Sequence, residues 1–573
     1  MRVALGCMRL STEPDRSDAR AAATLEAALA AGIVRFDTAR AYGLGDGDEG
    51  HNERLLARAL GARRPEVRIV TKCGMSRAGG GWTPDGRAAR ILEDAGASAE
   101  ALGGPPDVLL IHAPDPRVAW RTSLRALAKA REKGLAKAVG VSNVSRKQLE
   151  EALEVAPIAA VEIALGAYDD LGVRNGVAAL CLERGIELLA HAPLGGARRV
   201  GKLARDAALG RVAGARADLG PVGIALAYVL AVHPGIVPVV GASRPETIAK
   251  IAAAARVSLD ERELASLDER FPVLASLRRP PEIVQGAGGA EVVLMMGIPG
   301  AGKSSVAARM AGEGWERLNR DAIGGTLRGI AKRLDERLAA GATRIVLDNT
   351  YVTRATRHDV MRVARRHRAS VRCIHFDTPA VDAQINAVLR MIERFGRVLP
   401  PAELARASSR DAAALAPNAI FRMTRELEAP HHDEGFASIE VIPFVRAPSP
   451  GVTRPALVVD RRVVVDVEGV VAGAAPEAAV LLFAWRPGAG EEEIAAAAAE
   501  ARALSVATGR VVESAVCPHP AGPPVCWCRP PLPALVLEFA HRHAVDLRAS
   551  AMVATSASDH AMAKALGMSI SRP

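Results

Sequence analysis

Residues 1–275 alternate short β-branched apolar runs with long alanine-rich stretches of helical character. The apolar runs predict eight strands, at residues 2–5, 34–37, 67–71, 107–112, 138–142, 160–163, 186–190 and 236–240. Eight strands separated by helices over about 250 residues are the repeat of a (β/α)8 barrel. We therefore expect an N-terminal TIM barrel over residues 1–275.

Two breaks divide the rest of the chain. Residues 276–290 end in Gly286-Ala287-Gly288-Gly289 and have the composition of a linker. A second α/β unit is expected over residues 291–446, followed by a Pro- and Gly-rich break at 447–451. A third, smaller α/β unit is expected over residues 455–573.

Composition supports several cores in one soluble chain. The 573 residues exceed what one hydrophobic core accommodates, and 49% of them are apolar while only 3% are aromatic. We found no run of eighteen apolar residues and no signal-peptide pattern at residues 1–11, which argues against a membrane partner and predicts a cytoplasmic protein. The net charge of +10 permits a polyanionic partner but receives little weight alone.

Four polar residues follow the predicted barrel strands where a TIM barrel carries its chemistry, at the C-terminal ends. Asp37 and Tyr42 follow the second strand, Lys72 ends the third, and His112 ends the fourth. Each alone is more often structural. Their occurrence together, in this order, favours a catalytic site.

These four motifs resemble those of the aldo-keto reductases over about 270 residues. The resemblance implies carbonyl reduction, with Tyr42 as the general acid for a small-molecule carbonyl substrate. A phenol has a pKa near 10 and needs a neighbouring cation to donate its proton readily. Lys72 would supply that charge, Asp37 would hold Lys72 by a salt bridge, and His112 would orient and polarise the carbonyl.

The same resemblance implies an NADP(H) site. Ser142 and Asn143 would bind the nicotinamide carboxamide, and the loop that begins at Gly241 would hold the adenosine phosphate. Ser243 and Arg244 in that loop favour NADP over NAD. Glu162 departs from the family because it stands where a glutamine usually contacts the nicotinamide amide. A carboxylate accepts from that amide but cannot donate to it.

The second unit opens with a complete phosphate-binding loop. The apolar run 292–296 predicts a buried strand that leads directly into a glycine-rich loop, and helix-forming residues follow. In this context the loop is a Walker A motif, which predicts binding of ATP with Mg²⁺. Lys303 would bridge the β- and γ-phosphates and Ser304 would ligate magnesium. The expected nucleotide-binding residues are Gly297, Gly300, Gly302, Lys303, Ser304 and Ser305.

Later motifs in this unit suggest the phosphate acceptor. Asn319-Arg320-Asp321 follows the first helix, and the apolar run 345–347 ends in Asp348-Asn349. With Glu434-Gly435-Phe436, these motifs resemble the kinase domain of polynucleotide 5′-kinase/3′-phosphatases over about 150 residues. The resemblance implies that Asp321 is the general base, that Asp348 or Asn349 faces the acceptor or the metal, and that the partner is a nucleic acid 5′ end.

Arg390, Arg394 and Arg397 recur every three to four residues, so they would lie on one helix face. They resemble a lid that closes over the transferring phosphoryl group, where guanidinium groups stabilise spread charge. A solvated helix face is the alternative interpretation. A small-molecule kinase that acts on a sugar, nucleoside or antibiotic hydroxyl would use the same loop and base.

Three of the seven cysteines cluster near the C-terminus with a histidine. Cys517, His519, Cys526 and Cys528 supply three thiolates and an imidazole, which can close a tetrahedral zinc site with no open position. We therefore predict a structural Zn²⁺, against the alternative of a chance cluster.

The third unit resembles haloacid-dehalogenase-type phosphatases, which carry such a zinc loop. The resemblance places a nucleophile at Asp466, with Glu468 where an aspartate is usual. The expected hydroxyl is missing after the next strand, and Arg529 precedes proline where a lysine is expected. The third unit is therefore predicted to have a Rossmann-like, haloacid-dehalogenase-type fold and to hydrolyse nothing.

Three hypotheses for the whole chain remain open from the sequence. The first combines NADP-dependent carbonyl reduction with phosphorylation of a DNA or RNA 5′-hydroxyl. The second is a small-molecule pathway enzyme whose kinase phosphorylates the alcohol made by the reductase. In the third, the barrel is an NADPH-sensing binding module without turnover.

Overall fold

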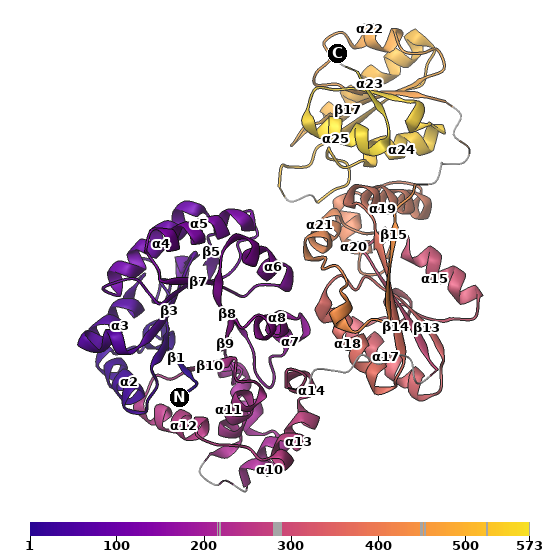
Figure 1. Cartoon of the computed structure of the whole chain (residues 1–573). Coiled ribbons are helices and arrows are strands. Elements are labelled where there is room, and N and C mark those ends of the chain that lie inside the picture. The colour runs from indigo at the N-terminus through magenta and orange to yellow at the C-terminus, as the bar shows by residue number, and fades with distance from the viewer. Residues whose placement is uncertain are drawn as a thin grey trace. The chain divides into compact units, whose positions relative to one another are not determined.

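A computed structural model describes residues 1–214, 216, 219–278, 289–446, 451, 454–522 and 525–571. The chain forms two compact units, Met1–Glu282 and Ile283–Pro573 (Figure 1). Most of the predicted linker (279–288) and most of the second predicted break (447–450) lie outside the described residues. No helix among the described residues is long and apolar enough to cross a membrane.

The first unit is a closed barrel of eight parallel strands, as predicted. The strands run in the order β1-β10-β9-β8-β7-β6-β3-β2, and the pairing of Ala4 with Val239 and of Leu5 with Phe36 joins β1 to both of its neighbours. The strands are β1 (Ala4–Gly6), β2 (Arg35–Asp37), β3 (Arg68–Cys73), β6 (Val108–Ile111), β7 (Ala138–Ser142), β8 (Ile158–Ala164), β9 (Glu187–His191) and β10 (Ile236–Gly241).

Helices surround the barrel because each presents an apolar face to the strands. The main ones are α2 (Asp18–Ala30), α3 (His51–Leu60), α4 (Ala88–Ala101), α5 (Trp120–Glu132), α6 (Arg146–Val155), α8 (Val177–Glu183), α11 (Gly220–Val232) and α12 (Pro245–Ala255). Additional helices are α1 (Arg9–Thr12), α7 (Leu171–Arg174), α9 (Gly196–Ala204), α10 (Ala207–Gly214), α13 (Glu261–Arg270) and α14 (Pro272–Ala275). A hairpin of β4 (Met75–Ser76) and β5 (Thr83–Pro84) follows β3.

The inside of the barrel is filled by side chains, so it is a packed core and not a channel. Val70, Leu110, Ala160, Leu189 and Val239 belong to this inner cluster, and all are buried. Polar groups lie above and below this apolar layer: Arg35 and Arg68 pair with Glu187 where the strands begin, and the expected catalytic residues lie where the strands end.

The second unit contains two parallel five-stranded sheets. The first has the order β12-β13-β11-β14-β15, and its central strand β11 leads directly into the phosphate-binding loop. Its strands are β11 (Glu291–Met296), β12 (Glu316–Leu318), β13 (Arg344–Asp348), β14 (Ser370–Asp377) and β15 (Ser438–Pro443). Its helices are α15 (Lys303–Gly312), α16 (Arg320–Ile323), α17 (Leu327–Ala339), α18 (Arg354–Arg366), α19 (Ala380–Phe395), α20 (Pro401–Ala407) and α21 (Pro417–Glu426).

The second sheet has the order β18-β17-β16-β19-β20. Its strands are β16 (Ala456–Asp460), β17 (Ala479–Trp485), β18 (Val512–Cys517), β19 (Ala551–Val553) and β20 (Ser569–Ser571), with helices α22 (Val467–Ala472), α23 (Glu491–Thr508), α24 (Ala534–His543) and α25 (Ala557–Leu566). The predicted α/β fold class, a barrel followed by two parallel sheets, is thus confirmed, and both sheets lie in one compact unit. One hydrophobic core includes Met391 and Leu404 from the first sheet's helices and Trp527 and Phe539 from the C-terminal part.

Candidate functional sites

A cavity of about 760 Å³ opens at the C-terminal ends of the barrel strands. Most of the residues expected to act in the barrel line it, although they come from five different strands or the segments after them. These are Asp37, Tyr42, His112, Ser142, Asn143, Glu162 and Gly241. The strand-end rule therefore brings the predicted catalytic and nicotinamide-side residues to one place.

Lys72 lies behind the Tyr42 hydroxyl and connects it to two carboxylates. Its Nζ donates to the Tyr42 hydroxyl oxygen at 3.3 Å, forms an ion pair with Asp37, and lies 3.1 Å from Glu162 Oε2. All four side chains are buried. Glu162 therefore serves as a second counterion of Lys72, a role that the sequence analysis did not assign.

The electrostatics of this cluster follow from burying three charges together. Burial raises the pKa of Asp37, and the Glu162 carboxylate adds to this rise. Burial alone would lower the pKa of Lys72, but the two carboxylates hold it well above its usual value. Burial also raises the pKa of Tyr42, and the Lys72 cation opposes this rise. At neutral pH Tyr42 is a protonated phenol beside a permanent cation.

His112 faces the same cavity as a neutral imidazole. Burial, together with the nearby Lys72 cation, lowers the pKa of His112 well below its usual value. Its ring lies 5.8 Å from the Tyr42 ring, centroid to centroid, and its Nδ1 is buried with no hydrogen-bond partner in the part of the chain that the structure describes. A neutral histidine can donate one hydrogen bond to a carbonyl oxygen without carrying a charge of its own.

The sequence analysis missed two further residues of the cavity. Trp82, just before β5, lies edge-on to the rings of Tyr42 and His112, with centroid separations of 6.0 and 5.8 Å. His191 ends β9, and its Nε2 lies 3.1 Å from Asn143 Oδ1. The strand-end rule could have found His191. Trp82 lies in an irregular loop, where no periodicity marks it.

The expected adenosine side lies at the start of α12. Gly241 ends β10, and Arg244 is the exposed N-cap residue of α12, with extended backbone geometry. Ser243 is half-buried beside it. A helix N-terminus with a free arginine side chain suits a phosphate group. Ser243 and Arg244 do not line the cavity described above.

The phosphate-binding loop between β11 and α15 has the geometry that its sequence predicts. Gly297, Gly300 and Gly302 all have positive φ angles, of 149°, 84° and 91°. A side chain at Gly300 would place its Cβ only 2.4 Å from the Ala383 carbonyl oxygen, so only glycine fits there. Lys303 Nζ donates to the carbonyl oxygens of Gly297 and Ile298, each at 2.8 Å.

Asp348 and Asn349 have different surroundings. Asp348 is buried at the end of β13, where its Oδ1 accepts from the Ser304 hydroxyl at 3.5 Å and its carboxylate pairs with Arg317. Asn349 instead supports the neighbouring turn, because its Oδ1 accepts from the Arg320 N–H at 2.9 Å. Of the two, Asp348 is the one that contacts Ser304, the residue expected to ligate magnesium.

Asp321 and Arg390 both act electrostatically on Lys303. Burial lowers the pKa of Lys303 to about 8; Asp348 and Asp321 oppose this shift, and Arg390 adds to it. Asp321 lies in the first turn of α16 with its side chain half exposed. Asp321 and Arg390 thus both influence the pKa of Lys303, and their roles as base and lid stay predictions.

The three arginines predicted to form a lid do not behave alike. Arg390 donates to the Ala412 carbonyl oxygen at 2.9 Å, whereas Arg394 and Arg397 pair with Asp411 and Glu403 at 2.9 and 2.7 Å. Of the three, Arg390 is the one whose cation contributes to the lowered pKa of Lys303.

Residues 2–270 match the aldo/keto reductase family, and residues 292–391 match an AAA domain family. A 6-dehydroglucose reductase of Agrobacterium fabrum is 33% identical over 282 residues, which are 46% of this chain and 91% of that protein. The chain belongs to the aldo/keto reductase family. Its barrel is thus an aldo-keto reductase, followed by a P-loop domain of the AAA kind.

Further relatives cover the same reductase part. An aldo-keto reductase of Gibberella moniliformis is 31% identical over 183 residues, 32% of this chain and 54% of that protein. Among solved structures, a glycerol dehydrogenase from Gluconobacter oxydans is 26% identical, covers 49% of this chain and 93% of its own, and has a TM-score of 0.42. An aldo/keto reductase from Klebsiella pneumoniae with NADP and acetate is 22% identical, with coverages of 47% and 91% and a TM-score of 0.41.

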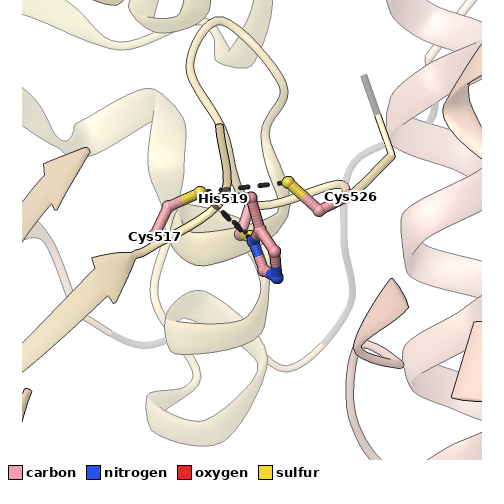
Figure 2. Close-up of side chains that lie close together, drawn as sticks. Cys517, His519 and Cys526 are labelled. Atoms are coloured by element: carbon pink, nitrogen blue, oxygen red, sulfur yellow. Dashed lines mark hydrogen bonds between the residues drawn. The ribbon is translucent and has the colours of Figure 1, made fainter. Parts of the chain in front are cut away.

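Beyond the reductase barrel and the P-loop domain, a cluster of metal-ligating residues forms at the end of β18 (Figure 2). The ligand atoms of Cys517, His519, Cys526 and Cys528 all lie within 4.8 Å of one another. Cys517 Sγ is 3.9 Å from Cys526 Sγ and 3.3 Å from Cys528 Sγ. Sulfur atoms about 2.3 Å from one tetrahedral zinc would be separated by similar distances, so the donor set fits this ion.

The prediction that Asp466 is a nucleophile at the end of a strand is wrong. Residues 463–469 do not form a strand: Val465 is 99% exposed, and Asp466 is an exposed N-cap residue whose side chain accepts from the Gly469 N–H at 2.8 Å. The carboxylate at the strand end is Asp460, which is fully buried.

A guanidinium group occupies the place beside Asp460. Arg462 lies 2.7 Å from Asp460 Oδ2 and 3.2 Å from Asp559 Oδ2, so the two buried carboxylates share one cation. Asp559 Oδ1 remains without a hydrogen-bond partner among the described residues.

The Glu434-Gly435-Phe436 motif has a structural role in the P-loop domain. Arg357 is completely buried, and its Nε and Nη2 bind the two Glu434 carboxylate oxygens at 2.9 and 2.8 Å. The Arg357 Nη1 also donates to the carbonyl oxygens of Tyr351 and Glu428, at 3.1 and 3.0 Å. The pair therefore ties α18 to the segment before β15.

Proposed function

We propose that the barrel catalyses the NADP(H)-dependent reduction of a small-molecule carbonyl. The observation that carries this proposal is the contact of Lys72 Nζ with the Tyr42 hydroxyl at 3.3 Å, beside His112 and inside one cavity. The cavity also contains Ser142 and Asn143, the residues expected to hold the nicotinamide. The name of the Agrobacterium relative adds oxidised sugars to the candidate substrates.

In this reaction NADPH, when bound, supplies a hydride to the carbonyl carbon. Negative charge then develops on the carbonyl oxygen, where His112 and Tyr42 both donate hydrogen bonds. Tyr42 transfers its proton to that oxygen, and the Lys72 cation stabilises the phenolate that remains. Asp37 and Glu162 hold Lys72 in place. Their charge also keeps Lys72 protonated throughout the reaction.

The test is oxidation of NADPH by a panel of aldehydes and sugar aldehydes, followed by absorbance. Tyr42→Phe should lower the rate by at least a hundredfold, within the range that a general acid contributes. Tyr168→Phe is the matched control, because Tyr168 lies on the same barrel but outside the cavity and binds Asp206. NADPH binding without turnover of any substrate would instead favour a sensing module.

We further propose that the P-loop domain phosphorylates the 5′-hydroxyl end of DNA or RNA. In this proposal Lys303 and the glycine loop hold the ATP phosphates, while Ser304 and Asp348 hold magnesium. Asp321 accepts the proton of the attacking hydroxyl, and Arg390 stabilises the charge on the transferring group. The half-exposed position of Asp321 supports this proposal, because an open base is accessible to the end of a long polymer.

The experiment uses labelled ATP, magnesium and a 5′-hydroxyl oligonucleotide. Lys303→Ala and Asp321→Asn should each abolish labelling, while Asp335→Asn, an exposed acid of the same domain, should leave it unchanged. Labelling of sugars or nucleosides with no labelling of the oligonucleotide would contradict the end-repair proposal and favour a small-molecule kinase.

For the C-terminal part we propose a structural Zn²⁺ and no phosphatase activity. The tetrahedral donor set supports the first, and the Arg462 guanidinium between Asp460 and Asp559 supports the second. Elemental analysis of purified protein should give one zinc per chain. Release of phosphate from a 3′-phosphate oligonucleotide that Asp460→Asn stops would refute the second proposal.

A further inference from the structure

Trp527 connects the metal-ligand cluster to the P-loop domain. It stands between Cys526 and Cys528, is completely buried, and donates from Nε1 to the Leu415 carbonyl oxygen at 2.7 Å. Leu415 belongs to the loop between α20 and α21, so a residue of the metal loop holds a backbone group of the phosphate-binding domain. Both parts lie in the same compact unit.

The opposite side of the same loop is held by the arginines of α19. We define residues 411–415 as the anchor segment. Arg390 donates to the Ala412 carbonyl oxygen at 2.9 Å, and Arg394 Nε donates to Asp411 Oδ2 at 2.9 Å. The anchor segment is thus fixed between Trp527 on one side and two arginines on the other.

Arg390 extends this chain of contacts to the phosphate site. Its helix contacts the phosphate loop, because Asn386, one turn before Arg390 on α19, donates from Nδ2 to the Gly300 carbonyl oxygen at 2.8 Å. The Arg390 cation also contributes to the lowered pKa of Lys303. The Arg390 Nε is buried and has no hydrogen-bond partner among the described residues, so a guanidinium N–H on this helix has the chemistry to bind a phosphate oxygen.

Packing reinforces the hydrogen bond. α24 packs on α19, the helix that carries Arg390 and Arg394. Trp527 and Leu532 share a hydrophobic core with Met391 and Leu399 at the end of that helix. Displacing the indole would therefore disturb α19 as well as the anchor segment.

We propose that Trp527 is a positioning residue for phosphoryl transfer, through which the metal-ligand cluster fixes Arg390. Cys526 and Cys528, as ligands of a bound metal, would fix the position of Trp527 between them. Trp527 in turn holds the anchor segment, which Arg390 contacts. The C-terminal part would then contribute to phosphoryl transfer through structure alone, because metal binding would order the anchor segment that contacts Arg390. This inference rests on the proposed kinase function.

The experiment compares Trp527→Phe with Trp485→Phe in the full chain. Phenylalanine keeps most of the packing at either position but removes the indole N–H. Trp485 is the matched control because its Nε1 also donates to the metal loop, at the His519 carbonyl oxygen 2.9 Å away, without contacting the anchor segment. The amides of residues 408–416 should exchange hydrogen roughly fivefold faster or more in Trp527→Phe, as the loss of one hydrogen bond predicts. They should exchange at the wild-type rate in Trp485→Phe.

Metal removal should have the same effect without a substitution. Treatment with a chelator should speed exchange at residues 408–416, and added Zn²⁺ should restore protection. In the kinase assay, Trp527→Phe should lower kcat at least fivefold while the binding stoichiometry of a non-hydrolysable ATP analogue stays at the wild-type value. Reductase activity of the same samples should not change.

Two results would overturn the inference: wild-type exchange at residues 408–416 in Trp527→Phe, or no response of this segment to metal. The exchange measurement needs no turnover. If the wild-type chain transfers no phosphate, the kinase proposal fails while the link from metal to Arg390 is still decided by exchange.

Discussion

The Glu434→Gln substitution should destabilise the P-loop domain strongly, because it leaves the Arg357 guanidinium charged and buried. Arg357 is 0% exposed, and two of its nitrogen atoms bind the Glu434 carboxylate within 2.9 Å. Removing one partner of a buried ion pair typically costs about 3–5 kcal/mol. The carbonyl groups that Arg357 also binds do not compensate for the lost negative charge.

Native-state hydrogen exchange of the full chain measures this cost locally, which avoids assigning one unfolding free energy to a chain of several parts. Amides in α18 and β13 should exchange faster by roughly two to three and a half orders of magnitude, the equivalent of that free energy. Amides in the reductase barrel should not change. The exposed pair of Arg366 and Asp335 is the control, and Asp335→Asn should cost less than about 1 kcal/mol.

A double-mutant cycle isolates the interaction between the two side chains. Once Arg357→Met has removed the buried positive charge, Glu434→Gln should cause little further loss of stability. The losses of stability from the two substitutions should therefore be strongly non-additive. The reasoning would be refuted if Glu434→Gln exchanged within threefold of wild type, or if the two losses simply added.

Three further outcomes follow from the sites. The pKa of His112 lies well below its usual value, so the group is neutral above that pKa, and kcat/KM for carbonyl reduction should show no acid limb from His112 between pH 6 and 8. The pKa of Lys303 is about 8 in the free loop, and bound phosphates should raise it. ATP binding should therefore take up protons near pH 8, measurable by calorimetry in buffers of different ionisation enthalpy, and Lys303→Met should abolish the uptake. In the C-terminal part, Asp466→Ala should cost about 1 kcal/mol as a lost helix cap. Asp460→Asn should cost several times more, because it removes the nearer carboxylate partner of Arg462 at a fully buried position; equal losses of stability in chemical denaturation would contradict this assignment.

The barrel and most of its site could be predicted because both follow from strand periodicity. Asp37, Lys72 and His112 each lie at a strand end, and parallel strands bring their ends together. His191 obeys the same rule. The second contact of Lys72, with Glu162, could not be predicted, because it depends on which side chains of distant strands point toward each other.

The C-terminal part shows where local patterns fail. The run Val463-Val464-Val465 has strong β propensity, but the sheet uses the run 456–460 just before it, and Val465 is left in solvent. Tertiary pairing decides between two adjacent apolar runs, and propensity does not. For the same reason the sequence did not reveal the common core of Trp527 and α19. Periodicity shows that a face is apolar and does not show which partner covers it.

That common core bears on how the chain can be divided for experiments. A fragment ending at Arg446 would lack Trp527, Phe539 and the other C-terminal members of the core that includes Met391 and Leu399. Such a fragment is expected to aggregate even with its nucleotide loop intact. The common core also offers a reason why the C-terminal part is retained: natural selection can keep a segment for the neighbour that it completes.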